Sequence, residues 1–434
     1  MSHMESTKIG SFVAREPRTG SRTRDVIAAN FGTFFEWFDL LVYAMFAITI
    51  SRLFFPQGDP QSALLLSLMT FASSFLIRPV GAVVLGIMAD KVGRRATLSF
   101  AAMLMLAGTI LIAISPTYDA IGVWAPVILV TGRLLQGFSV GGEFGTANSY
   151  LTEQSASRKA FFASLQFSAS GLAVLAASLF AYFSNHFLSQ DQIYAWGWRL
   201  PFLFGCLIGP VGLYIRSRIE ETADFEQVKR EGATVHNPLA ETFRSHKRFV
   251  LIGAVVAAAG VVASFLNLYM PTFAINNLGL TKDDAFIASI CSGVVCTLVP
   301  MLGGITADRL GTVKVMRTAL VLGVILVFPL FQLLTRSPSL LTLAVFQCTL
   351  SVVFYSFYFS PIGSLLSQLF PTSCRTTGVS IAYVIAQTFF GGITPLVVGF
   401  MVKATGSVMA PAYYIVVIAV FALIGLYASR KHVT

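Results

Sequence analysis

Long apolar runs separated by short polar breaks dominate the chain. A helix of about 20 apolar residues crosses the hydrocarbon core of a bilayer, and runs of that kind predict twelve helices. They cover residues 26–51, 62–88, 96–115, 120–150, 160–184, 198–215, 248–275, 284–306, 313–334, 339–368, 376–402 and 407–429. The pattern therefore predicts an all-α polytopic membrane protein with twelve transmembrane helices.

The longest polar segment divides these spans six and six. We expect an N-terminal tail (1–25), a first six-helix half (26–215), a cytoplasmic linker (216–247) and a second six-helix half (248–434). The halves also repeat: GIMADKVGRR after the second span resembles GGITADRLGTVK after the eighth, so Asp90 and Asp308 are 218 residues apart. A duplicated, pseudo-symmetric pair of halves predicts a transporter with its site between them, near mid-membrane.

The loop charges predict the orientation. Of 30 Lys and Arg residues, 23 lie in the terminal segments or after even-numbered spans, and five lie after odd-numbered spans: Arg52, Arg199, Lys282, Arg336 and Lys403. Cytoplasmic loops carry the excess of basic residues. We therefore expect a multi-pass protein of the bacterial inner membrane, with both termini cytoplasmic.

Composition excludes several other classes. The chain of 434 residues is 55% hydrophobic and only 12% charged, with a mean hydropathy of +0.75, far from the roughly 25% charged residues of soluble proteins. Its net charge of +10 is scattered through short loops, which argues against nucleic acid. Five cysteines without a CxxC pair predict neither a disulfide framework nor a metal site. The opening Met1–His3 is typical of residues left by an expression vector.

Several motifs resemble a known family. GIMADKVGRR (86–95) is similar to the loop signature of the major facilitator superfamily, and RLLQGFSVGGEFG (133–145), EWFD (36–39), WGWRLPF (196–202) and FFGGITPL (389–396) resemble its metabolite:proton symporters. The resemblance covers almost the whole chain. It is strongest to the citrate and tricarballylate proton symporters, while related members carry ketoglutarate, shikimate or betaines. The second-half copy of the loop signature departs from the pattern: DRLGTVK (308–314) lacks the two adjacent basic residues, Arg94 and Arg95, of the first copy. The loop of the second half is therefore expected to hold the helix ends together less strongly.

Two carboxylates lie within the first predicted span, in IAANFGTFFEWFDLLVYAMFAITI (27–50). Counted from Asp25 at about 1.5 Å per residue, Glu36 is roughly 16 Å and Asp39 roughly 21 Å deep, and they share one helix face. Arg78 lies about 18 Å deep on the second span. Ionisable groups inside a membrane are costly and usually face a transport path.

We interpret these acids as proton-coupling groups, because a carboxylate facing a dry cavity can load a proton and a neighbouring arginine can release it. Asp39 is the leading candidate, with Glu36 beside it and Glu143 as a further one. The family resemblance pairs Asp39 with Arg133 of the RxxQG pattern, whereas the depth count pairs it with Arg78. Its partner stays open, and a buried ion-pair network that only fixes helix packing is the alternative.

Fixed positive charge at mid-membrane also suits an anionic substrate, because arginine binds carboxylates bidentately. Arg78 and Arg133 are therefore candidate substrate ligands, although in a betaine carrier they would serve gating only. Polar groups within other spans extend this set: Gln166, Asn267, Tyr358, Tyr383 and Gln387. Each of them has a simpler alternative role in helix packing.

The ADKVGRR turn suggests a conformational latch. Asp90 can accept backbone N–H groups, while Arg94 and Arg95 can reach an acid such as Glu153 at the cytoplasmic end of the fourth span. The general excess of basic residues in cytoplasmic loops would alone explain the two arginines, but it would not explain Asp90.

These features favour a symporter that imports a small organic anion, a di- or tricarboxylate such as citrate, together with protons. The alternatives are a carrier of another metabolite, such as ketoglutarate, shikimate or a betaine, and a proton-driven efflux antiporter. The chain lacks a GxxxxGK[ST] loop and any catalytic motif, so we expect no enzyme activity, no cofactor, the proton gradient as the energy source, and a functional monomer in the lipid bilayer.

Overall fold

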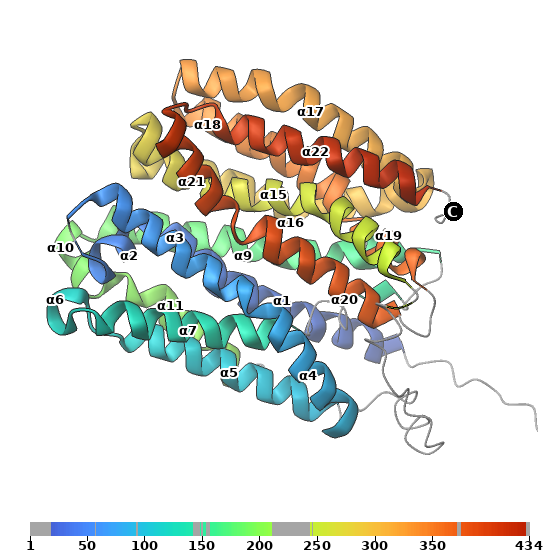
Figure 1. The fold of residues 1–434 in the computed structure, drawn as a ribbon, viewed down its shortest axis with the longest axis horizontal. Coiled ribbons are helices and arrows are strands. Elements are labelled where there is room, and N and C mark those ends of the chain that lie inside the picture. The colour runs from blue at the N-terminus through green and yellow to red at the C-terminus, as the bar shows by residue number, and fades with distance from the viewer. Residues whose placement is uncertain are drawn as a thin grey trace, which may run out of the picture.

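The computed structural model describes residues 19–56, 58–92, 94–141, 148, 151–152, 157–210, 244, 246–370 and 375–430. Their side chains are described from Asn30 onwards, apart from those of residues 86, 87, 89–92, 94–96, 98, 375 and 376. Every regular element in this part of the chain is a helix. Figure 1 shows two groups of helices side by side, with the N-terminal group in blue to green and the C-terminal group in yellow to red.

The N-terminal group contains α1 to α11. Its elements are α1 (Thr19–Met45), α2 (Ala47–Phe54), α3 (Pro60–Leu76), α4 (Arg78–Val92), α5 (Arg94–Ile114), α6 (Tyr118–Ile121), α7 (Trp124–Val140), α9 (Lys159–Phe187), α10 (Gln190–Gln192), the π-helix η1 (Ile193–Gly197) and α11 (Arg199–Gly205). The first apolar run is broken, because α1 and α2 meet at an angle of 66°. At the start of α3 the Asp59 side chain accepts hydrogen bonds from the N–H groups of Gln61 and Ser62, ahead of Pro60 at the first helical position.

The C-terminal group contains α15 to α22. Its elements are α15 (Lys247–Leu278), α16 (Lys282–Leu310), α17 (Thr312–Arg336), α18 (Leu340–Leu350), the π-helix η2 (Ser351–Phe359), α19 (Ile362–Leu369), α20 (Arg375–Ala386), the π-helix η3 (Gln387–Gly391), α21 (Thr394–Thr405) and α22 (Ala410–Ser429). Gly279 and Gly406 end α15 and α21 in the left-handed conformation that glycine adopts freely.

Eight helical segments in the described residues are long and apolar enough to cross a membrane, and the bent α1–α2 pair is a ninth candidate. The observed helices α15, α16 and α17 agree with the predicted spans to within a few residues. The all-α membrane architecture is thereby confirmed. The described part of α7 ends before residues 142–147, and α11 ends before residues 211–243, which lie outside the description, so the count of twelve stays a prediction.

The two groups of helices touch along α9 and α16, which pack at backbone distance. A Cβ atom added at Gly171 would lie 2.1 Å from the carbonyl oxygen of Cys296, and one at Gly293 would lie 2.7 Å from the Cα atom of Leu175. Only glycine permits such an approach. Further contacts join α1 to α15 and α3 to α21, so the inner faces of α1, α3, α9, α15, α16 and α21 bound the middle of the molecule.

Candidate functional site

A buried chain of hydrogen bonds connects Asp39 to Arg133. Gln136 of α7 donates its Nε2 to the Asp39 carboxylate of α1 and to the Thr109 hydroxyl of α5, the latter at 3.0 Å. The Gln136 Oε1 accepts a hydrogen bond of 2.7 Å from Arg133, one turn earlier on α7. Asp39 and Arg133 are only 2% and 1% exposed. The Gln136 amide therefore connects a buried carboxylate to a buried guanidinium group, whose charges interact strongly because burial reduces screening by solvent.

Of the two partners left open for Asp39, the structure places Arg133, the partner from the family resemblance, nearer to it than Arg78, the partner from the depth count. The count began at Asp25, but α1 begins at Thr19, so Asp39 lies 20 residues along its helix, or roughly 30 Å. Arg133 is the cation whose charge acts on Asp39.

Aromatic rings surround the Arg133 guanidinium. Its central carbon lies 4.6 Å from the ring centre of Tyr43 and 5.6 Å from that of Phe71, and Nη2 reaches the Ser74 hydroxyl at 3.4 Å. Cation–π contacts of this kind partly replace the lost hydration of a buried arginine. The Arg133 Nε and the Asp39 Oδ1 have no hydrogen-bond partner among the described residues, so each retains capacity for a ligand or a proton.

Arg78 joins the two groups of helices. At the start of α4 it donates to the Oε1 of Gln387 in η3, and Gln387 donates its Nε2 to the Tyr383 hydroxyl of α20 at 3.0 Å. The guanidinium stacks on Phe75 at 4.1 Å, and the charge of the half-buried Glu36 acts on it. Predicted candidates Arg78, Tyr383 and Gln387 therefore lie together, although more than 300 residues separate the first from the others.

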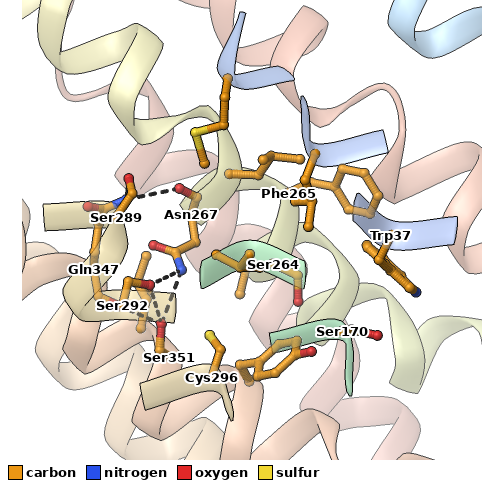
Figure 2. A pocket seen from close by; sticks show the side chains of 17 residues that line it. Trp37, Ser170, Ser264, Phe265, Asn267, Ser289, Ser292, Cys296, Gln347 and Ser351 are labelled. Carbon is orange, nitrogen blue, oxygen red and sulfur yellow. Dashed lines mark hydrogen bonds between the residues drawn. The ribbon is translucent and has the colours of Figure 1, made fainter. Parts of the chain in front are cut away.

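A cluster of neutral polar side chains lies on the side of the C-terminal helices that faces α1. Asn267 of α15 donates to the hydroxyls of Ser292 and Ser351 at 2.8 and 3.1 Å, and Gln347 of α18 donates to Ser289 at 3.2 Å. Figure 2 shows these groups on one wall of a small cavity, with Trp37 across from them. Within the part of the chain that the structure describes, the buried oxygens Asn267 Oδ1 and Gln347 Oε1 have no hydrogen-bond partner. They are acceptors available to a ligand that donates hydrogen bonds.

The cavity of this neutral cluster is almost closed. Its volume is about 30 Å³, and its wall includes Trp37 of α1 and Ser170 of α9 as well as α15, α16, α18 and η2. A volume of that size holds about one water molecule. The walls must therefore separate before a metabolite can enter.

Two π-helices set the directions of several of these polar side chains. Ser351 and Tyr355 belong to η2, and Gln387 begins η3. A π turn adds one residue to the helical repeat and shifts the direction of the following side chains, a device common at functional sites. The Tyr355 hydroxyl consequently reaches across the molecule and donates to the carbonyl of Phe167 on α9 at 2.8 Å.

Other predicted candidates lie elsewhere. The Tyr358 hydroxyl donates to the carbonyl of Val256 inside the C-terminal group and is fully buried there. Gln166 of α9 is buried, its Oε1 has no hydrogen-bond partner, and it does not line the cavity beside Asn267. Glu143 and Glu153 lie outside the described residues. The same holds for the side chains of Asp90, Arg94 and Arg95.

The two groups of helices are also tied at both ends. At the end of α16, the Asp308 carboxylate accepts hydrogen bonds of 2.9 Å from the N–H groups of Ala160 and Phe161 at the start of α9. At the opposite end Lys403 lies 3.5 Å from Asp59. Asp308, the counterpart of Asp90 in the sequence repeat, thus caps a helix of the other group without the paired basic residues.

Sequence reasoning did not identify five neutral members of these networks: Gln136, Ser289, Ser292, Gln347 and Ser351. Gln136 lies three residues after Arg133, on the same helix face, and that spacing is the signal that identifies it. Ser289 and Ser292, and likewise Gln347 and Ser351, also lie one turn apart. Such serine and glutamine pairs occur in many packed helices, so their spacing does not separate a site from simple packing.

Comparison with known proteins agrees with this architecture. Residues 30–395 match the family described as Major Facilitator Superfamily. The citrate-proton symporter of Salmonella typhi is 34% identical over 92% of each chain, and the proline/betaine transporter of Escherichia coli K12 is 32% identical over 93% of this chain and 83% of its own. The crystal structure of a D-xylose-proton symporter has a TM-score of 0.73 at 19% identity, covering 95% of this chain and 98% of its own.

Proposed function

Since the chain belongs to the Major Facilitator Superfamily, we propose that it is a proton-coupled symporter that imports a small organic anion, a di- or tricarboxylate such as citrate. The protein is a multi-pass inner-membrane transporter and not an enzyme. The observation that carries the proposal is the set of one carboxylate and two arginines, Asp39, Arg78 and Arg133, buried on the N-terminal helices α1, α4 and α7.

In this proposal Asp39 carries the coupling proton. Protonation would neutralise the carboxylate, weaken its link through Gln136 to Arg133, and leave that arginine free to bind substrate. Arg78 binds a second carboxylate of the substrate and exchanges its bond to Gln387 for it. Glu36, near Arg78, assists, and Glu143 is the further candidate for proton transfer.

The C-terminal helices supply the neutral contacts. Asn267 and Gln347 each present an unsatisfied oxygen, which suits the hydroxyl group of a hydroxy acid such as citrate. Gln387 and Tyr383 connect these helices to Arg78. Gln166 and Tyr358 are weaker candidates, because they lie away from the cavity.

The orientation follows from loop charge: we propose that both termini face the cytoplasm, that the chain acts as a monomer surrounded by lipid, and that the proton gradient is its energy source without a cofactor. Asp308 then closes the cytoplasmic end. Asp90, Arg94, Arg95 and Glu153 form the corresponding latch of the first half. The domain division at residues 216–247 belongs to the same proposal.

The test is uptake of labelled citrate into proteoliposomes with and without an imposed inward pH gradient. We expect uptake that rises with the gradient and is competed by di- and tricarboxylates. Competition by betaine or proline instead would support the alternative represented by the 32% identical relative. Uptake that falls when the gradient is imposed would indicate a proton-driven efflux antiporter. Absence of uptake for every candidate would contradict the symport proposal.

A further inference from the structure

A second, much larger cavity lies at the end of the bundle remote from Asp308. It has a volume of about 1000 Å³ and is bounded by α2 and α3 of the N-terminal group and by α15, α16 and α21 of the C-terminal group. Helix α16 runs from Lys282 at this cavity to Asp308 at the other end. In the proposed orientation the cavity faces the periplasm.

Two cations from opposite groups of helices line it. Arg52, at the end of α2, donates to the Tyr194 hydroxyl at 2.6 Å, and Lys282, at the start of α16, donates to the Gln190 Oε1 at 3.0 Å. They lie near enough that the charge of Arg52 acts on Lys282. Other polar lining groups are the amides of Gln61, Asn276 and Asn277, and none of the described lining residues is acidic.

The acids near the rim are engaged elsewhere. Asp59 lies 3.5 Å from Lys403, and Asp283 lies 3.8 Å from His186. Asp284 accepts a hydrogen bond of 2.7 Å from the Thr281 hydroxyl. None of these three carboxylates belongs to the described lining of the cavity.

The placement of these cations departs from the charge pattern of the chain. Only five basic residues follow odd-numbered spans, and positive charge is generally scarce on that side of a membrane protein. Arg199 contacts backbone carbonyls, and Lys403 contacts Asp59. Arg52 and Lys282 instead share one cavity between the two groups of helices, where like charges repel unless an anion lies between them.

We propose that this cavity is a vestibular anion-binding site, formed by Arg52 and Lys282, that captures a polycarboxylate from the periplasm before it reaches Arg78 and Arg133. The identity of the anion rests on the proposed function. Amides of Gln61, Gln190 and Asn277 supply hydrogen-bond donors around the two charges. Because each group of helices contributes one cation, separation of the groups at this end divides the site and weakens its hold on the anion.

The experiment measures citrate uptake by right-side-out vesicles as a function of ionic strength. The test variants are Arg52→Gln, Lys282→Gln and their combination; Lys282→Arg keeps the charge. Arg336→Gln is the matched control, since it removes one exposed positive charge on the same side but does not line the cavity. The amount of protein in the membrane is measured for each variant.

We expect the double variant to raise the KM for citrate about 3- to 10-fold at low salt, as loss of electrostatic capture predicts, with a maximal rate within about twofold of the original chain. At 0.5 M salt the difference should shrink to less than about twofold. Lys282→Arg and Arg336→Gln should leave the KM unchanged.

An equal KM in the double variant and in Arg336→Gln would overturn the vestibular site. So would a KM increase that persists at high salt, because it would indicate disturbed packing at the outer mouth. Failure of the proposed function looks different: the original chain would then take up no citrate at any salt concentration. Isothermal titration of citrate at low salt would then decide the vestibular site, since weaker binding by the double variant than by Arg336→Gln supports it and equal binding overturns it.

Discussion

The two groups of helices differ in the kind of polarity that they bury. The N-terminal group buries charge, namely Asp39, Arg78 and Arg133. In the described part of the C-terminal group, the buried polar side chains are hydroxyls and amides, such as Ser292, Ser351, Gln347, Gln387 and Thr388, and none is charged. The contrast is notable because the sequence repeat indicates that the groups arose by duplication.

The difference teaches how a symmetric scaffold can divide two tasks. A buried charge responds to protonation and to the charge of a substrate, whereas a buried amide responds to shape and hydrogen bonding. Keeping the charged groups on one side also limits the cost of burying ions to one set of helices. We therefore assign coupling to the N-terminal helices and neutral recognition to the C-terminal helices, and the following variants test that assignment.

Asp39→Asn should have the largest effect. Asparagine keeps the size of the side chain and an oxygen that can accept the Gln136 hydrogen bond, but it cannot release a proton. Accumulation driven by a pH gradient should fall to the level of protein-free liposomes, while counterflow at equal pH on both sides should persist, since exchange needs no proton release. Labelled citrate in proteoliposomes measures both activities.

Glu36→Gln is the matched control for Asp39→Asn, because Glu36 lies on the same helix, three residues away. It should reduce uptake but leave it driven by the pH gradient. If Asp39→Asn retained full pH-driven accumulation, the proton site would be misassigned, and Glu36 or Glu143 would be tested next.

Arg78→Gln should have the next largest effect, on substrate affinity. A charge-assisted hydrogen bond contributes about 1.5–3 kcal/mol, so citrate binding should weaken by more than about 1 kcal/mol. Isothermal titration on purified protein measures this. Arg199→Gln is the control, because Arg199 donates to the carbonyls of Ala195 and Ser115. Unchanged affinity in Arg78→Gln would assign this arginine to gating.

Gln136→Leu should lower the stability of the folded protein by disrupting the hydrogen bonds between Asp39 and Arg133, although it removes no charge. It leaves the Asp39 carboxylate and the Arg133 guanidinium without their shared partner, and each unsatisfied buried group costs about 1–3 kcal/mol. Thermal unfolding in detergent should show a lower Tm. Gln166→Leu is the control, since the Gln166 Oε1 has no partner to lose. Equal Tm values in both variants would mean that Gln136 does not stabilise the pair.

Ser351→Ala should have the smallest effect and the most selective one. It removes neutral hydrogen bonds to Asn267 and Ser292, worth about 0.5–1.5 kcal/mol, so citrate affinity should fall tenfold or less. The ratio of pH-driven uptake to counterflow should stay constant. Ser178→Ala, which removes a bond to the α9 backbone, is the control. A changed ratio in Ser351→Ala alone would contradict the division of tasks.

Much of the fold follows from apolar run lengths, and the site follows only in part. The limits of α15, α16, α17 and α22 lie close to the predicted ones because charged residues and glycines mark the ends of these helices. The 66° bend between α1 and α2 has no such mark, since both sides of Phe46 are apolar and the bend depends on tertiary packing.

The candidate site shows the same limit. Buried arginines and carboxylates are conspicuous in an apolar chain, so Asp39, Arg78 and Arg133 were predictable. The partner of Asp39 stayed open between Arg133, from the family resemblance, and Arg78, from the depth count, and the structure connects Asp39 to Arg133 through Gln136. The contact between Arg78 and Gln387 depends on the docking of two helices far apart in the chain, and Tyr358 is buried because η2 directs it toward Val256.

The glycine contact between α9 and α16 has a mechanical consequence. Gly171, Gly293 and Gly304 bring bare backbone against backbone, so few side chains interlock across the middle of this contact. At such a contact the two helices can slide and rotate against each other with little steric hindrance from side chains. The contacts at the two rims, where Asp308 holds one end and Lys403 with Asp59 holds the other, then add to the bonds that Arg78 and Tyr355 make between the groups as barriers to rocking. We expect the speed of turnover to depend in part on these rim contacts.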